Sequence, residues 1–166
     1  MWGIPDAIVL TDKAPAPPEA RITLAACALT PRIAIASTLI VESTLERPAK
    51  LTLTKHGTIA SLGALKPGDA TPIQLPIAGH AVSMTLDAGG VYRLAIDGAD
   101  DGAWIVNAPG GVTDATGLAT LRLPPGLHEA TAWLPVRGGQ EWKVVKSTVT
   151  VEANALAELA IDLGPR

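Results

Sequence analysis

Phenylalanine is absent from this chain of 166 residues, and tyrosine and cysteine occur once each. The single cysteine, Cys27, excludes an internal disulfide and a zinc site built from CxxC pairs. Because Cys27 stands among apolar residues, we expect it to be a small buried side chain. Aromatic residues make up only 3% of the sequence, so the core must be filled by Ala, Val, Ile and Leu, with four tryptophans as the large anchors.

Charge is also scarce, at 17% of residues, and the net charge is −3. This balance gives no electrostatic reason to expect binding to nucleic acid or to an anionic membrane. No apolar run of about 18 residues is present, which excludes a membrane-spanning helix. The first ten residues lack a basic stretch followed by an apolar one, so no signal peptide is predicted. Either the protein is not exported or a signal has been removed. A surface with so few charges favours burial against a partner.

The most informative stretch is GVTDATGLATLRLPPGLHEATAWLP, residues 111–135. Asp114 to Gly117 is typical of a turn, because glycine adopts positive φ without strain. Residues 118–123 alternate apolar and polar side chains, as a half-buried strand does. Pro124-Pro-Gly126 then interrupts the strand, and alternation resumes up to Trp133. The pattern predicts a β-hairpin in which Leu121 and Leu123 are buried.

Turn signals recur every 8 to 12 residues along the rest of the chain, and no long segment has helical periodicity. Between Arg32 and Ser43 the alternation slips near Ser37, which predicts a β-bulge. Asp87 to Gly90 is predicted to be a hairpin turn. Residues 155–163 could form a helix from their Ala, Leu and Glu content, but their alternation favours a strand. Regular punctuation of this kind predicts an all-β sandwich.

The hairpin Asp114–Trp133 resembles the strand–turn–strand unit of carboxypeptidase regulatory-like β-sandwiches. It is most similar to that unit as it occurs in bacterial cupredoxin-like proteins of the methylamine-utilisation, plastocyanin-like type. The segments Pro5–Leu10 and Cys27–Ile35 also resemble parts of these proteins. The resemblance implies a Greek-key-type, cupredoxin-like sandwich over residues 1–107. It implies a carboxypeptidase-regulatory-like unit over residues 108–166, whose sheets residues 4–10 could share.

The copper ligands of such proteins are missing here. The family's upstream histidine would fall near Arg47–Lys50, and the histidine expected after Pro31 is replaced by Arg32. The ligand loop would fall between Ile96 and Trp104, where no Cys, His or Met occurs. We therefore expect no copper and no other cofactor.

The other candidate sites have no sequence motif that supports them. His56, His80 and His128 are far apart in the sequence, and no spacing joins them as metal ligands. His128 is expected at the edge of the core with a hydrogen-bond partner. Asp97, Asp100 and Asp101 share a loop with glycines and are weak calcium candidates, although the EF-hand pattern is absent. Trp133 is the candidate for an exposed contact residue.

No nucleophile elbow or comparable signature frames a catalytic residue, so we expect no enzymatic activity. The sequence indicates a non-catalytic binding or structural module, an accessory or subunit domain that acts through protein–protein contacts. A protein partner or self-association is expected, and the family resemblance implies a periplasmic or extracellular location. The alternatives are a metal-binding electron-transfer protein with a rearranged site, and a carbohydrate-binding module that uses exposed tryptophan.

Overall fold

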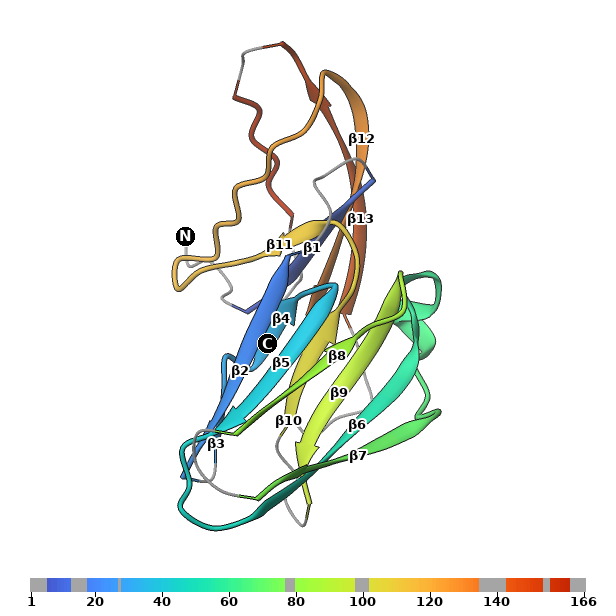
Figure 1. The fold of residues 1–166 in the computed structure, drawn as a ribbon. Helices are drawn as coiled ribbons and strands as arrows, with labels where there is room; N and C mark the ends of the chain where they lie inside the picture. Colours follow the sequence, from blue (N-terminus) through green and yellow to red (C-terminus); the bar gives the residue numbers. More distant parts are fainter. Residues whose placement is uncertain are drawn as a thin grey trace. The chain divides into compact units, whose positions relative to one another are not determined.

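The regular secondary structure of the described residues is almost entirely β-strand, as expected for an all-β sandwich (Figure 1). The computed structural model describes residues 6–12, 18–26, 28–76, 80–97, 102–134, 143–153 and 156–161. The contacts divide the chain into two units. One unit comprises Pro17–Ala108, and the other combines Met1–Ala16 with Pro109–Arg166. The sequence suggested parts of 1–107 and 108–166, with sheets of the second part that residues 4–10 could share; in the structure the first strand, Ile8–Thr11, pairs with strands of the C-terminal segment.

The unit Pro17–Ala108 contains two sheets. The five-stranded sheet has the order β4-β10-β9-β6-β7, and the four-stranded sheet has the order β3-β2-β5-β8. The strands of the first are β4 (Ile33–Ile35), β6 (Ala49–Thr58), β7 (Ala70–Leu75), β9 (Gly90–Ile96) and β10 (Gly102–Val106). Those of the second are β2 (Glu19–Ala25), β3 (Ala28–Thr30), β5 (Thr38–Ser43) and β8 (Ala81–Thr85). The β4–β10 and β2–β5 pairs are parallel, and the other pairs are antiparallel.

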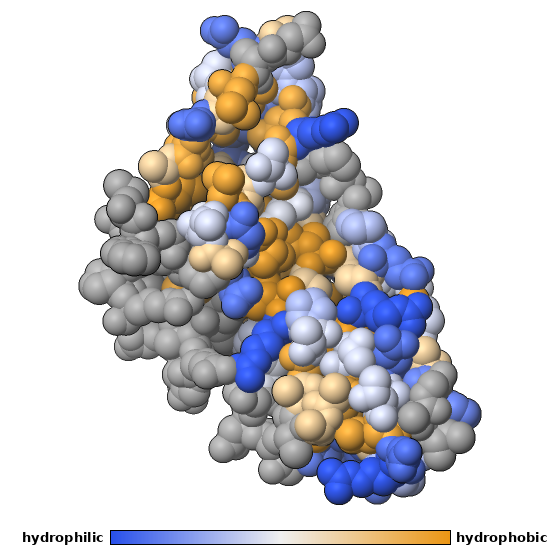
Figure 2. Space-filling view, turned by 90° about the vertical axis from the view of Figure 1, so that its left-hand side faces the viewer, coloured by the Kyte–Doolittle hydropathy of each residue, from blue (hydrophilic) through white to orange (hydrophobic). Residues whose placement is uncertain are grey.

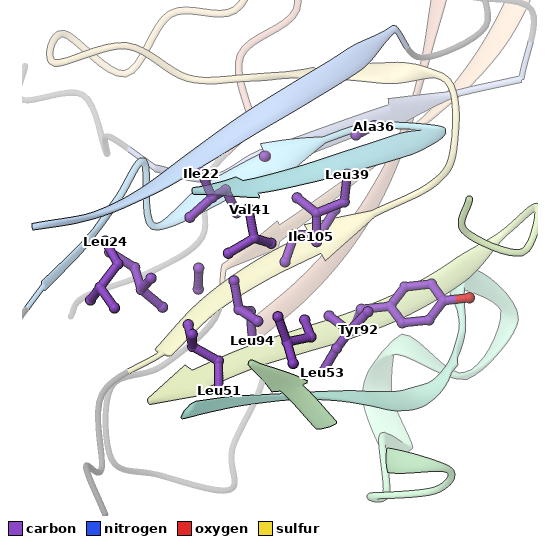
Figure 3. Close-up of a cluster of buried hydrophobic side chains, with 14 of the residues drawn as sticks. Ile22, Leu24, Ala36, Leu39, Val41, Leu51, Leu53, Tyr92, Leu94 and Ile105 are labelled. Atoms are coloured by element: carbon purple, nitrogen blue, oxygen red, sulfur yellow. The ribbon is translucent and has the colours of Figure 1, made fainter. Parts of the chain in front are cut away.

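Aliphatic side chains from the two sheets form a single core between them (Figure 3). Ile22 and Leu39 come from the four-stranded sheet, and Leu94 and Ile105 come from the five-stranded sheet; all four are fully buried. Each strand contributes alternate residues because successive side chains point to opposite faces. Branched aliphatic side chains thus fill this core, and Tyr92 is its one aromatic member among the described residues.

The segment Arg32–Ser43 differs from the prediction of one bulged strand. The slip in alternation near Ser37 marks a change of sheet: β4 belongs to the five-stranded sheet and β5 to the four-stranded sheet. The same correction applies to the hairpin predicted at Asp87–Gly90. The turn exists, with the Gly90 amide donating to the Asp87 carbonyl at 3.0 Å, but β8 and β9 lie in different sheets. A tight turn and a crossover between sheets share the same turn residues.

A 3-10 helix, η1 (Ile59–Ala64), follows β6. Its position coincides with the stretch Ile59–Leu65, where the sequence fits either a helical turn or an irregular strand. Thr58, the last residue of β6, precedes the helix, and its amide donates to Ser61 Oγ at 3.3 Å. Among the described residues no helix is long and apolar enough to span a membrane.

The second unit contains one antiparallel sheet with the order β11-β1-β12-β13. Its strands are β1 (Ile8–Thr11), β11 (Gly110–Val112), β12 (Gly126–Leu134) and β13 (Lys143–Val151). β1 lies between β11 and β12, with Ile8 opposite both Val112 and Trp133. A strand from the start of the chain therefore completes a sheet made by its C-terminal part.

The predicted hairpin at residues 111–135 is half correct. The turn at Asp114–Gly117 forms, with Gly117 at a φ of +82°, and the second strand is β12. However, residues 118–125 form no strand, and β12 pairs with β1 and β13 instead. Leu121 and Leu123 are only half-buried.

The alternation in residues 118–125 has another structural cause. A Cβ added at Gly111 would meet Leu121 Cδ2 at 2.9 Å and the Ala119 Cβ at 3.7 Å, so this segment lies across a face of the sheet. An extended segment resting on an apolar face shows period-two alternation without entering a ladder.

The C-terminal segment also differs from the prediction. Residues 156–161 form neither the favoured strand nor a helix, and all but Ile161 are exposed. Ile161 packs against the small cluster of Ala7, Ala132 and Leu134 on the sheet. The rest of the predicted segment, residues 155, 162 and 163, lies outside the described residues.

Candidate functional site

His128 is a buried polar side chain of the second unit. It lies on β12 in alternation with Ala130 and Ala132, and its exposed fraction is 1%. Its Nδ1 lies 3.0 Å from Asp12 Oδ1, and its Nε2 lies 2.7 Å from the Pro124 carbonyl oxygen. Because a carbonyl oxygen can only accept, Nε2 donates to Pro124. The buried imidazole therefore links two more exposed partners, and its bond to Pro124 attaches the segment before β12 to the sheet.

The structure does not assemble the three histidines. His128 belongs to the C-terminal unit, whereas half-buried His56 and exposed His80 belong to the Pro17–Ala108 unit. No group of three or more His, Cys, Asp or Glu side chains suited to a metal ion occurs among the described residues. Cys27 lies outside those residues.

Of the calcium candidates, only Asp97 is described; Asp100 and Asp101 lie outside the described residues. Asp97 is exposed, and its Oδ1 accepts a hydrogen bond from the Thr52 hydroxyl at 2.8 Å. Thr52 is on β6, the strand beside β9, so this contact joins the residue that follows β9 to the neighbouring strand.

Trp133 is not the exposed contact residue that the sequence suggested. Its exposed fraction is 0%, and it stands opposite Ile8 on β1. The prediction placed its side chain on the face opposite Ala130 and Ala132, which the register bears out. It was wrong in equating that face with solvent, because alternation tells which residues share a face and not which face is covered.

Trp104, and not Trp133, is a tryptophan on an outer sheet face that is partly open to solvent. Its neighbours on β10, Ala103 and Ile105, are buried in the core of the sandwich, so Trp104 points to the opposite face of the five-stranded sheet. It is half-buried there. In the sequence, Trp104 stands between a small and an aliphatic core residue, a pattern that indicates a side chain on the outer face. The residues around Trp133 show the same pattern, so the sequence could not tell the two tryptophans apart.

His56 and Arg93 accompany Trp104 on this sheet. The rings of His56 and Trp104 meet edge to face, with centroids 5.0 Å apart and planes at 71°, an arrangement that aromatic pairs favour. Arg93 stands opposite Trp104 on β9. Burial lowers the pKa of His56, and the positive charge of Arg93 lowers it further. The imidazole is therefore biased towards its neutral form, beside an indole that is partly open to solvent.

The outer edge of β13 is a second candidate surface. β13 is nine residues long and ends the sheet β11-β1-β12-β13 among the described residues. The direction of its backbone groups follows from hydrogen bonds on the far side of the sheet. The Thr11 amide donates to the Pro109 carbonyl at 3.1 Å, and the Thr113 amide donates to the Ala7 carbonyl at 2.9 Å. Odd-numbered residues of β1 thus direct their backbone groups to β11, and even-numbered ones direct theirs to β12.

The registers carry this alternation across the sheet. Leu10 is opposite Thr131, so Thr131 bonds to β1 and its neighbour Ala130 bonds to β13. Ala130 is opposite Ser147, so the odd-numbered residues of β13 bond to β12. The amides and carbonyls of the even-numbered residues point away from the sheet, and these residues are Val144, Lys146, Thr148 and Thr150.

Exposed leucines are concentrated in the same unit. Among the described residues, five large hydrophobic side chains are exposed: Ile59, Leu118, Leu127, Leu156 and Leu159. All but Ile59 belong to the unit that contains β13. Leu127 is 67% exposed and stands opposite Thr150 of β13, and Leu156 is 84% exposed. On the face drawn in Figure 2, hydrophobic residues in orange reach the surface between scattered hydrophilic ones.

No protein-family model, curated protein or solved structure matches this chain.

Proposed function

We propose that this chain is a non-catalytic binding or structural module, which serves as an accessory domain or subunit through protein–protein contacts. The observation that carries the proposal is the exposure of Leu118, Leu127, Leu156 and Leu159 on one unit. Burying apolar area of this kind against a partner contributes about 25 cal/mol per Å². With 17% charged residues in the chain, few like charges oppose such an approach.

The test combines two measurements on the pure protein. Sedimentation over a range of concentrations reports self-association, and a pull-down from an extract of the source cells reports other partners. We expect one of the two to be positive. Leu127→Ser and Leu156→Ser should weaken the association, whereas Ile59→Ser, an exposed change on the other unit, should not. A strictly monomeric protein that recovers no partner, yet turns over a substrate, contradicts the proposal and favours an enzyme.

We further propose that the sandwich is of the cupredoxin-like, Greek-key type with a carboxypeptidase-regulatory-like unit, and that the protein works in the periplasm or outside the cell. The support is the sequence resemblance of Asp114–Trp133 and of the N-terminal segments. Fractionation of the source cells tests the location: recovery in the cytoplasmic fraction alone contradicts it.

A second candidate function is carbohydrate binding at Trp104. The observation that favours it is the half-buried indole on an outer sheet face, flanked by His56 at 5.0 Å. Aromatic faces provide apolar contact area while the ring's polar edge reaches a partner. Retardation of the protein in gels that contain soluble polysaccharides should be lost in Trp104→Ala and largely kept in Trp104→Phe. Equal retardation of both variants and the parent contradicts this function.

A further inference from the structure

We propose that β13 pairs antiparallel with β13 of a second copy of this chain, which joins two four-stranded sheets into one continuous sheet. This inference rests on the proposed function and specifies its partner. An open strand edge is a template for another strand, and proteins usually protect it by short length, proline or charge. β13 has nine residues and no proline, and its two charged residues are Lys143, at the start of the strand, and Lys146.

The backbone of β13 restricts how two copies can meet. Only the even-numbered residues direct their amides and carbonyls outward, so even-numbered residues must oppose even-numbered ones. Among such registers, the one centred on Ser147 pairs all nine residues of the strand. It places Val144 opposite Thr150 and Lys146 opposite Thr148 of the second copy. Four pairs of this kind form about eight backbone hydrogen bonds.

The side chains favour the same register. Moving the centre to Lys146 would place the two lysines opposite each other, which destabilises a strand pair. With the centre at Ser147, Val145 instead faces Val149 of the second copy on the half-buried side of the sheet. The pairing therefore matches β-branched residues and separates like charges.

Opposite charges also line up across the proposed junction. Glu129 is opposite Thr148 within one copy, and Thr148 is opposite Lys146 of the second copy. The Glu129 carboxylate and the Lys146 ammonium of the second copy then lie in one row on the same face of the sheet, with Thr148 between them. Two strand spacings amount to about 10 Å between backbones, a separation that two long side chains can bridge. The two-fold symmetry creates this row twice.

The first experiment is site-specific crosslinking in a Cys27→Ser background, so that each protein carries one thiol. In the proposed register the two Ser147 residues form a non-hydrogen-bonded pair, with Cα atoms about 4.5 Å apart. That separation lies within the range a disulfide spans. Ser147→Cys should therefore give a covalent dimer on mild oxidation. Val145→Cys is the matched control, because the two introduced thiols would be offset by four residues, or about 13 Å, and should remain largely without a covalent crosslink.

The second experiment removes an outward amide and leaves the ladder to β12 intact. Thr148→Pro lacks the amide that would bond to the second copy, and proline is tolerated in an edge strand where its nitrogen faces outward. Thr148→Ala keeps the amide. Sedimentation should show Thr148→Pro as a folded monomer of 17.0 kDa and Thr148→Ala as a dimer, with matching circular dichroism spectra.

Several results overturn the self-pairing of β13. They are the absence of crosslinking in Ser147→Cys, equal crosslinking in Val145→Cys, or an unchanged dimer in Thr148→Pro. If self-association is absent while a different protein is captured through Leu127 and Leu156, the self-pairing is wrong and the proposed function stands.

Discussion

The carboxylate of Asp12 lies 3.0 Å from Nδ1 of His128, and it joins the end of β1 to the buried side of β12. The other ring nitrogen donates to the Pro124 carbonyl at 2.7 Å. One buried imidazole on β12 thus contacts both the segment that directly precedes this strand and the end of β1, which is 116 residues away in the sequence. It holds residues 118–125 in place without a β-ladder.

We expect His128→Ala to lower the free energy of unfolding by about 2–4 kcal/mol. The substitution leaves a cavity and deprives the Pro124 carbonyl of its donor. Urea unfolding followed by circular dichroism measures the change. Glu129→Ala is the control, since this neighbour on β12 is exposed and its loss should stay within about 0.5 kcal/mol. Equal effects of the two changes would show that the network does not stabilise the unit.

The half-burial of Leu121 gives a graded prediction. Leu94→Ala, in the centre of the sandwich at 0% exposure, should cost about 2–5 kcal/mol. Leu121→Ala should cost only about 1 kcal/mol, because the side chain loses less buried area. Arg122→Ala, exposed beside it, should have almost no effect. Chemical denaturation of the three variants checks the order, and a Leu121→Ala effect as large as that of Leu94→Ala would show that residues 118–125 are packed more deeply.

His56 makes stability depend on pH near neutrality. Burial, followed by the charge of Arg93, lowers its pKa in the folded state below the ordinary value of 6.5. The unfolded chain therefore binds the proton more readily, and stability falls as the pH decreases from about 6.5 towards the folded pKa. His56→Gln should flatten this part of the stability–pH curve, whereas His80→Gln, exposed in the same unit, should leave it unchanged. The opposite sign of the slope would contradict the assignment.

Asp114 should titrate below the ordinary range. The Thr116 hydroxyl donates to its Oδ1 at 2.6 Å, the Thr116 amide donates at 2.8 Å and the Leu118 amide donates at 3.1 Å. These donors lower the pKa of the carboxyl from 3.8. The stabilisation is present above pH 3.8 and is lost as the pH falls through the lowered value. NMR titration of the Asp114 carboxyl measures the shift, and Thr116→Val should move the pKa back towards 3.8.

Gly110 is required by the close approach of β1. A Cβ at this position would collide with the Val9 carbonyl oxygen, which is backbone and cannot move aside. We expect Gly110→Ala to cost about 1–3 kcal/mol, as overpacking does. Gly111→Ala is the matched control, because its Cβ would meet the flexible end of Leu121. Thermal unfolding should show the larger loss for Gly110→Ala, and the reverse order would contradict the pairing of β1 with β11.

The sequence predicted those turns and strands that depend only on neighbouring residues. The turn at Asp114–Gly117 and the strand β12 were predicted correctly because glycine, proline and alternation act over a few residues. The partners of β12 were not predictable in this way, since period-two alternation does not encode which strand lies alongside. The same limit explains why the slip near Ser37 was interpreted as a bulge and not as a change of sheet.

The candidate sites were less predictable than the strands. Trp104 and Trp133 both occupy alternating positions in strands, and only the three-dimensional structure shows that one is half-buried and the other fully buried. The open edge of β13 has no residue motif at all. It is defined by strand order, which depends on pairing between residues more than 100 positions apart, such as Ile8 and Trp133.

The insertion of Pro17–Ala108 between β1 and β11 determines an order of assembly during synthesis. The inserted unit has all of its strands once residue 108 has left the ribosome, and domains generally fold as units while the chain emerges. β1 is made before this unit, but its neighbours in the sheet are β11 and β12, so it has no strand partner until β11 (Gly110–Val112) is made. Truncation before that point should leave a folded inserted unit attached to an unpaired β1. Limited proteolysis of stalled chains would detect this state.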